Sequence, residues 1–257
     1  DLVTGEPIRN CGNCMYCHAG LYNHCLKEEK KIGGFGEYTV VRSDRVYKIP
    51  EGISPAETAL VEPLAFALHT LKLADTDRTD KILILGAGTI GQMIAVAAKS
   101  YGVENITITD VYQKKLAVAK EHGCSETIRV EPGKEKEIVQ NVLGHDNIDI
   151  VFDCVCNEAS MDTSIKVAKK NGKIVIVGVA EKKYPVDLGM VMFNELKILG
   201  TRMYNNGDFR NAIRLMDEKK VDVSQFISNT YALEDIQHAF METIEKKDKY
   251  LKSLIKV

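Results

Sequence analysis

Four cysteines lie close together near the start of the chain. Their spacing is C-x2-C-x2-C-x7-C, at Cys11, Cys14, Cys17 and Cys25. Four thiolates on one short segment can close a tetrahedral shell around a zinc ion and leave no coordination position for a substrate. A loop-rich segment has little apolar core, so metal binding would supply much of its folding free energy. The spacing therefore predicts a structural zinc site on residues 11–25, here called the cysteine lobe.

An iron–sulfur cluster is the chemical alternative, because C-x2-C-x2-C also occurs in ferredoxins. The ferredoxin motif continues with a cysteine-proline pair after three further residues, and this chain has none there. A lobe without metal is the third possibility. His18 and His24 could replace one cysteine, although a surface position is the simpler expectation. We expect two cysteines further along, Cys124 and Cys154, to be small buried apolar residues.

A glycine-rich turn lies between two apolar runs in the middle of the chain. The run Ile82–Leu85 ends at Gly86, which opens a G-x-G-x-x-G motif, and a segment with apolar residues at helical spacing follows. A second β-like run, Ile106–Thr109, ends on Asp110, 19 positions after Gly91. A dinucleotide-binding strand–helix–strand unit has its acidic residue about 20 positions on. The segment therefore predicts such a unit.

The three glycines have separate roles in this prediction. Gly86 allows the tight turn, Gly88 lets the backbone approach a pyrophosphate, and Gly91 lets the helix pack on the strand. The helix begins at Thr89 and Ile90, where free N–H groups and the positive end of the helix dipole would face the phosphates. A scaffold of the same fold with no cofactor is the alternative.

Asp110 indicates which dinucleotide is bound. Its carboxylate should accept hydrogen bonds from both hydroxyls of the adenosine ribose and repel a 2′-phosphate, which favours NAD over NADP. Further along, Val177, Gly178 and Val179 should lie against the nicotinamide, and Arg202 could meet substrate or cofactor. The simpler alternatives are a turn aspartate, a core strand and a surface salt bridge.

Alternating strands and helices are needed to position these residues. Strands are expected at Ile82–Leu85, Ile106–Thr109, Glu126–Val130, Ile148–Cys154, Lys173–Val179 and Leu196–Gly200. Helices are expected between them, including Gln113–Gly123, Gly133–Leu143 and Ser160–Lys170. Six such strands predict an α/β fold with a doubly wound parallel sheet, whose ligand binds at the carboxyl ends of the strands.

The flanking segments have a different pattern. Glu37–Val41 and Arg45–Ile49 alternate like strands, Ser54 and Pro55 begin a short helix, and Leu60–Leu64 should break it before a second helix, Leu64–Leu73. After residue 203 the expected order is helix Phe209–Asp217, strand Ile227–Tyr231, helix Leu233–Ile244 and strand Tyr250–Val257. We assign this tail to the first domain, so the expected domains are 1–62 with 203–257, and 63–202.

Composition limits the function classes. A chain of 257 residues can form two domains, and a net charge of −2 gives no basic field for nucleic acid. No apolar run approaches the 18 residues of a membrane helix, and no signal peptide is visible, so a cytoplasmic location without a membrane partner is expected. Because the chain begins at Asp1, we expect it to be part of a longer protein.

Taken together, these motifs resemble the zinc-containing medium-chain dehydrogenase/reductase family of alcohol, sorbitol and threonine dehydrogenases. The cysteine lobe resembles the structural zinc lobe of that family, and Gly34–Tyr38 resembles its G-x-F-A-E-Y turn. Leu60–Leu64 followed by His69 is similar to its E-P-L…H segment, and Gly86–Gly91 with Asp110 matches its NAD fingerprint. The resemblance covers essentially the whole chain and implies a Rossmann domain beside a partial, β-rich GroES-like catalytic domain.

The resemblance also implies individual roles. Glu62 matches a carboxylate of the catalytic zinc site, Lys115 a basic residue beside the adenosine, and Lys252 a basic residue that reaches the pyrophosphate. His69 is expected to pack at the domain junction. Relatives form dimers or tetramers, so a homodimer or homotetramer is expected. The family usually has a glycine at Cys156, so the backbone that faces the cofactor should differ there.

The other ligands of the catalytic zinc, a cysteine and a His-Glu pair, precede the cysteine lobe in the family and have no counterpart in this chain. One carboxylate cannot hold a catalytic zinc, which needs about three protein ligands. We therefore expect an NAD-dependent alcohol or polyol dehydrogenase whose catalytic zinc site is complete only in a longer protein. A non-catalytic NAD-binding redox sensor or subunit is the alternative. A zinc module for nucleic acid is disfavoured by the net charge.

Overall fold

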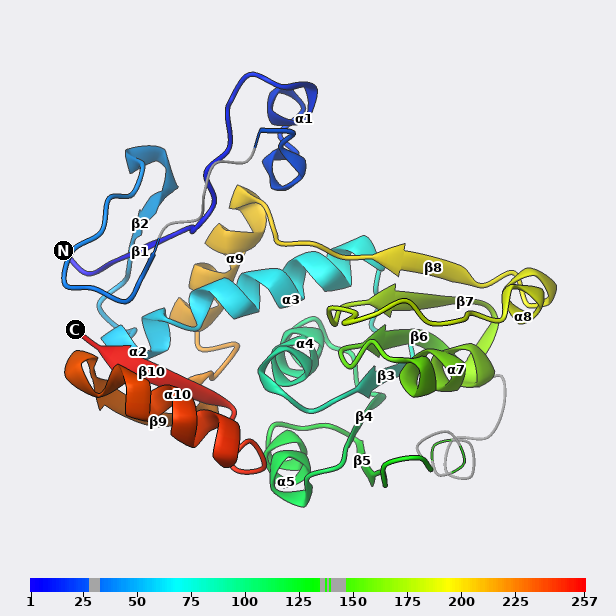
Figure 1. The fold of residues 1–257 in the computed structure, drawn as a ribbon. Helices are drawn as coiled ribbons and strands as arrows, with labels where there is room; N and C mark the ends of the chain where they lie inside the picture. The colour runs from blue at the N-terminus through cyan, green and yellow to red at the C-terminus, as the bar shows by residue number, and fades with distance from the viewer. Residues whose placement is uncertain (28–32, 135–136, 138, 140–146) are drawn as a thin grey trace. The chain divides into compact units, whose positions relative to one another are not determined.

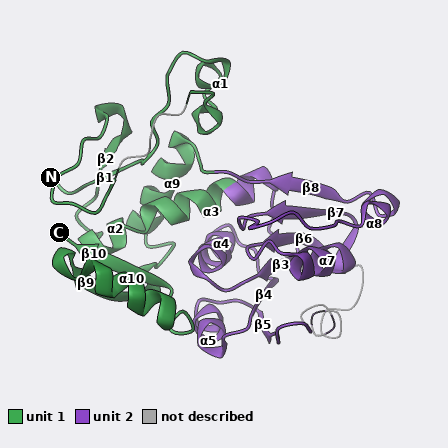
Figure 2. Cartoon of the chain, viewed as in Figure 1, with its two compact units in different colours: residues 1–69, 203–257 green, residues 70–202 purple. Residues whose placement is uncertain are grey.

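The computed structural model describes residues 1–27, 33–134, 137, 139 and 147–257. The chain forms two compact units, unit 1 from residues 1–69 and 203–257, and unit 2 from residues 70–202 (Figure 2). The sequence predicts the first boundary between residues 62 and 63, whereas in the structure it falls between residues 69 and 70. The shift arises because helix α3 (Val61–Leu73) is continuous through both positions.

Unit 2 is built on a six-stranded parallel sheet (Figure 1). Its strand order is β5-β4-β3-β6-β7-β8, and each neighbouring pair is parallel. The strands are β3 (Ile82–Leu85), β4 (Ile106–Asp110), β5 (Glu126–Arg129), β6 (Ile148–Asp153), β7 (Ala168–Ile176) and β8 (Lys197–Gly200). The order reverses between β3 and β6, which is where a doubly wound sheet opens a ligand crevice. The predicted doubly wound Rossmann fold is confirmed.

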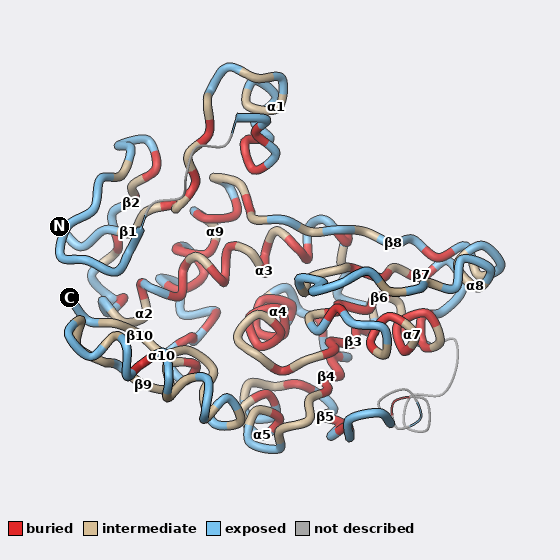
Figure 3. Tube along the Cα trace, viewed as in Figure 1, coloured by how far each residue is buried: buried red, intermediate tan, exposed pale blue. Residues whose placement is uncertain are grey.

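Among the described residues of unit 2, helices follow four of the strands: α4 (Thr89–Ser100), α5 (Gln113–Glu121), α7 (Glu158–Val167) and α8 (Leu188–Phe193). Helix α4 is buried at every position from Gly91 to Ala98, and all four residues of β3 are buried (Figure 3). This continuous burial explains the run of small and apolar residues in α4, because strand and helix exclude water from each other.

Unit 1 contains two small sheets. Strand β1 (Val3–Gly5) pairs antiparallel with β2 (Val46–Lys48), and β9 (Ile227–Ala232) pairs parallel with β10 (Lys252–Lys256). Its helices are α1 (Met15–His18), α2 (Pro55–Thr58), the first part of α3, α9 (Asn206–Asp217) and α10 (Ile236–Glu245). Ser54 caps α2 through a capping box with Glu57, and Pro55 occupies the first turn, as the sequence predicts.

Several predicted elements were wrong. The short helix does end, at Thr58, before a second helix, but that second helix begins at Val61 rather than Leu64, because Pro63 lies in the first turn of α3, where its missing N–H is not needed. Glu37–Val41 is not a strand and is almost wholly exposed. Helix α7 ends at Val167, so β7 begins at Ala168 rather than Lys173. The predicted helix Gly133–Leu143 lies largely outside the described residues. Strand β1 and helix α8 were not predicted.

Within the described residues, no helix combines the length and the apolar character needed to cross a membrane.

Candidate functional site

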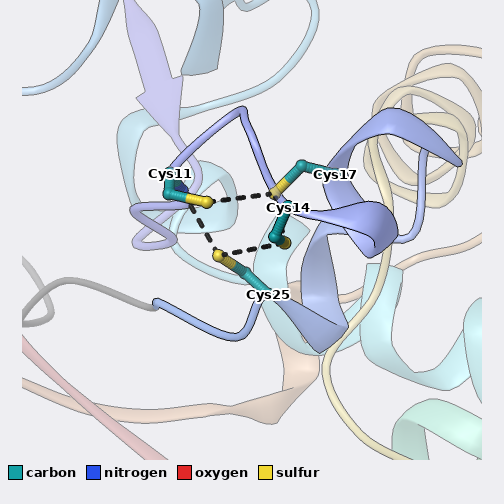
Figure 4. Close-up of side chains that lie close together, drawn as sticks. All are labelled: Cys11, Cys14, Cys17 and Cys25. Carbon is teal, nitrogen blue, oxygen red and sulfur yellow. Dashed lines mark hydrogen bonds between the residues drawn. The ribbon is translucent and has the colours of Figure 1, made fainter.

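The cysteine lobe gathers its four thiols at one point, although they come from different turns. Cys14 precedes α1, Cys17 lies within it, and Cys25 follows a short 3-10 turn, Tyr22–His24. All four sulfur atoms lie within 4.8 Å of one another (Figure 4). The Sγ atoms of Cys14 and Cys17 are 3.5 Å apart, and those of Cys14 and Cys25 are 4.0 Å apart. A tetrahedral zinc–thiolate site with Zn–S bonds of about 2.3 Å has sulfurs about 3.8 Å apart, so the donor set fits zinc.

Hydrogen-bond donors surround these sulfurs. The backbone amides of Cys11 and Lys27 donate to Cys25 Sγ at 3.3 and 3.4 Å. Backbone amides of Leu26 and Cys17 lower the pKa of the Cys14 thiol to about 6. Thiolate is the form that binds a metal, so the backbone already favours the binding form. His18 is exposed and neither it nor His24 joins the cluster of ligand atoms found among the described residues.

The glycine-rich turn of unit 2 has a geometry that only glycine provides. Gly86 has φ +98°, which a residue with a side chain rarely adopts. A Cβ on Gly91 would lie 2.0 Å from the carbonyl oxygen of Gly86, so a methyl group has no room between α4 and β3. A Cβ on Gly88 would meet no atom within 4 Å. That open space lies at the N-cap of α4, immediately before Thr89 and Ile90, and leaves room for a phosphate group.

A cavity of about 200 Å³ lies beside this turn. Gly86, Asp110 and Val111 line it, together with Val130 and Val155. A mostly apolar pocket with a few polar groups is suited to a flat base joined to a sugar that carries hydroxyl groups, as in an adenosine. The crevice is therefore at the carboxyl ends of β3 and β4, where the sheet topology requires it.

Asp110 connects the glycine-rich turn to the segment that follows β4. Its Oδ2 accepts a hydrogen bond from Ala87 N at 2.8 Å, and its Oδ1 accepts one from Tyr112 N at 2.9 Å. Each carboxylate oxygen keeps a lone pair for a further donor. The Lys115 ammonium lies 5.1 Å from the centre of the Tyr112 ring. Lys115 is half-buried and lies on α5, five positions after Asp110 in the sequence.

Sequence reasoning missed Gln92, which braces the turn from within α4. The side chain is fully buried, and its Nε2 donates to Ala87 O at 3.3 Å and to Lys115 O at 2.8 Å. A single amide thus joins the glycine-rich turn to α5. A polar residue within an otherwise apolar helical run was the signal in the sequence.

Asp153, at the end of β6, was also missed. Its carboxylate is fully buried; Oδ1 accepts from Val155 N and Cys156 N at 3.0 and 2.8 Å, and Oδ2 accepts from Ser160 Oγ at 2.8 Å. Burial raises the pKa of this carboxyl group. Cys156 has φ +56°, so it takes the left-handed conformation that glycine adopts easily. Cys156 is therefore a residue with a side chain in a backbone conformation that glycine adopts more easily.

The predicted nicotinamide residues follow β7. The amides of Val177 and Gly178 both donate to the backbone oxygen of Asp153 at 2.9 Å. A Cβ on Gly178 would lie 2.8 Å from Cys154 O and from Cys156 Cβ, so this position also requires glycine. Val179 is 89% exposed, which makes it available to a ligand rather than part of the core.

The remaining predicted residues are distributed between the units. Arg202 is the exposed last residue of unit 2. Glu62, in the first turn of α3, and Lys252, the first residue of β10, belong to unit 1. His69 Nδ1 lies 2.8 Å from Asp208 Oδ2, a structural pairing between α3 and α9. In the described part of the chain, the four cysteines are the only cluster of three or more metal-ligating side chains, and Glu62 is not a member.

Comparison with known proteins identifies the same two parts. The model of the zinc-binding dehydrogenases matches residues 89–218, and that of the alcohol dehydrogenase GroES-like domain matches residues 1–51. Sorbitol dehydrogenase of Bacillus subtilis is 28% identical over 99% of this chain and 74% of its own length. D-xylulose reductase A of Aspergillus niger is 31% identical over 99% of this chain and 73% of its own. A zinc-binding dehydrogenase of Sinorhizobium meliloti bound to NADP is 28% identical, with a TM-score of 0.85 over 92% of this chain and 71% of its own.

Proposed function

The chain belongs to the zinc-containing medium-chain dehydrogenase family, and on this premise we propose that it is an NAD-dependent dehydrogenase of secondary alcohols or polyols. The observation that carries the proposal is the crevice of unit 2, where the open space at Gly88 adjoins the cavity beside Asp110. The relatives are named as sorbitol dehydrogenase and xylulose reductase, which supports a small polyhydroxylated substrate.

Bound NAD supplies the hydride acceptor, and the residues of this chain bind and orient it. Gly86–Gly91 and the start of α4 would hold the pyrophosphate, while Val177, Gly178 and Val179 would border the nicotinamide. Asp153 fixes that border, because it receives hydrogen bonds from the segments that follow both β6 and β7. Arg202 and Lys115 are proposed as flanking cations, and Lys252 as a further contact from unit 1.

NAD is proposed over NADP, although a relative binds NADP. The Asp110 carboxylate has two oxygens, each held by one backbone amide and each with capacity for one ribose hydroxyl. A 2′-phosphate would bring further negative charge next to the Asp110 carboxylate and would be repelled by it.

Replacing Asp110 with serine should weaken NADH binding about 10- to 100-fold, because the net loss of one hydrogen bond to a charged group costs about 1.5–3 kcal/mol. Binding of NADPH should weaken less or improve. Titration of cofactor fluorescence measures both dissociation constants. Glu121→Ser, which removes an exposed carboxylate at the end of α5, is the matched control. Equal losses for NADH and NADPH would argue against the proposed preference.

Zinc is proposed to be structural. The four-cysteine set fits a closed site. Among the described residues, Glu62 belongs to no cluster of three or more metal-ligating side chains. A catalytic zinc needs about three protein ligands, so the side chains described do not fit one, and no step of the reaction is assigned to it.

We expect the purified chain to contain close to one zinc ion and to bind NADH without oxidising polyols at a measurable rate. Metal content by mass spectrometry, NADH titration and an NAD-reduction assay with sorbitol or xylitol test the three parts separately. A value near two zinc ions, or sustained NAD reduction, would show that a catalytic site is present. NADH binding without turnover also fits a redox sensor. This is the second candidate function, because the described residues contain no second cluster of metal-ligating side chains.

A further inference from the structure

Asn10 immediately precedes Cys11, and its side-chain amide can donate a hydrogen bond to the cysteine cluster. Its Nδ2 donates to Cys17 Sγ over 3.5 Å, and the side chain is only 7% exposed. The other donors described above, to Cys25 and Cys14, are backbone amides, which a side-chain substitution does not remove. The hydrogen bond from Asn10 to Cys17 Sγ is therefore one that a single substitution can remove.

The orientation of the Asn10 amide is set by Arg45. Arg45 Nη2 donates to Asn10 Oδ1 at 2.9 Å. A guanidinium group has donors and no acceptor, so the oxygen of the amide must face it. The NH2 group must then face Cys17, whose sulfur has to act as the acceptor. Sulfur accepts hydrogen bonds weakly, so this contact fixes the position of Cys17 Sγ.

Arg45 is held in turn by a buried carboxylate. Glu6 is fully buried, and its Oε2 accepts from Arg45 Nη1 at 3.2 Å and from Tyr22 Oη at 2.8 Å. Glu6 Oε1 accepts from the Tyr47 hydroxyl. The Arg45 guanidinium also lies over the Tyr22 ring, 3.7 Å from its centre. Tyr22, Tyr47 and Asn10 thus fix a pair of charges that would be costly to bury alone.

We propose that Asn10, aligned by Arg45 and Glu6, is a positioning residue that holds the Cys17 sulfur in the zinc site and slows the release of zinc. This inference rests on the structural zinc proposed above. Donors to ligating atoms fix the ligand and lower the reactivity of a bound thiolate, and their loss typically reduces metal affinity about 10- to 100-fold. Zinc retention in the lobe is therefore under the control of Arg45, which lies 35 positions from Asn10 in sequence.

The test compares Asn10→Asp with the wild-type chain. Aspartate keeps an oxygen for Arg45 and loses only the donor to Cys17. Asn10→Ala removes the donor without adding charge. Asn13→Asp is the matched control, because it adds the same charge at an exposed asparagine in the same lobe. Zinc release to a chromophoric chelator and the alkylation of each cysteine by iodoacetamide, located by mass spectrometry, are measured on the zinc-loaded chains.

Both Asn10 variants should release zinc about 10-fold faster than Asn13→Asp, and Cys17 should gain reactivity over the other three cysteines. A uniform gain at all four cysteines would indicate general loosening of the lobe and would overturn the assignment, as would wild-type release rates. If the wild-type chain holds no zinc, the proposed structural site itself fails, which is a different outcome. Should Asn10→Asp fail to fold, Asn10→Ala and Asn10→Ser carry the same comparison.

Discussion

Replacing Gly91 with alanine is expected to abolish measurable NADH binding and to destabilise unit 2. The added methyl group would lie 2.0 Å from the carbonyl oxygen of Gly86. Backbone cannot yield as a flexible side chain can, so α4 must move away from β3. Overpacking of this kind costs about 1–3 kcal/mol of stability. It also displaces the helix N-terminus that would face the pyrophosphate, and 3 kcal/mol lost from binding corresponds to about a hundredfold weaker affinity.

Gly88→Ala separates the two effects. Its added methyl group meets no atom within 4 Å, and its φ of −70° suits alanine, so the urea midpoint should stay at the wild-type value. NADH binding should nevertheless be lost, because the methyl group occupies the space left for phosphate. Gly200→Ala, at an open position on β8, is the control for both measurements.

A Gly88→Ala chain that binds NADH normally would place the pyrophosphate elsewhere. A Gly91→Ala chain that keeps its urea midpoint would mean that α4 does not pack on β3 as described. Cofactor fluorescence and urea unfolding followed by circular dichroism give both answers on the same samples.

The part of the fold that local pattern determines could be predicted from sequence. In unit 2, buried β-like runs alternate with helical segments, and a parallel arrangement follows because the connections are long. The roles of the glycines could also be predicted, because the turn, the close approach of the backbone and the helix packing each require a residue without a Cβ. Gly86 and Gly91 have the conformation and the crowding that these roles demand.

The errors have a common physical origin. Glu37–Val41 alternates like a strand, but a strand needs a neighbour, and in the described residues β2 pairs with β1 instead. Strand β1 is three residues long and too short to show a period. Pro63 looks like a helix breaker until its place in the first turn is known. Each of these three predictions depends on where an element begins or on which element lies beside it. Local sequence does not contain that information.

The candidate sites divide in the same way. The cysteine cluster follows from spacing within one lobe. Glu6, Asn10 and Arg45 come together across 35 and 39 positions, so no motif connects them. Gln92 and Asp153 act through backbone atoms of distant segments, and these partners appear only when the sheet is assembled.

Replacing Cys14 with serine should eliminate bound zinc and unfold much of the cysteine lobe. A neutral hydroxyl is a poor zinc ligand, and structural zinc supplies about 10–16 kcal/mol in small zinc-dependent domains. Metal analysis and limited proteolysis should show loss of zinc and new cleavage within residues 11–20. Chelation of the wild-type chain should give the same cleavage pattern. His18→Ala, at an exposed residue beside the cluster, should retain zinc and resist cleavage.

The two ends of the lobe should respond differently. Tyr22 keeps its hydrogen bond to the buried Glu6 after zinc is lost, so cleavage should spare residues near Tyr22. Unit 2 has a core of its own, and NADH binding to its crevice should survive the substitution. Retention of zinc by Cys14→Ser would show that the remaining three thiolates suffice. Equal cleavage on both sides of Tyr22 would show that zinc, rather than the Glu6 network, holds the whole lobe.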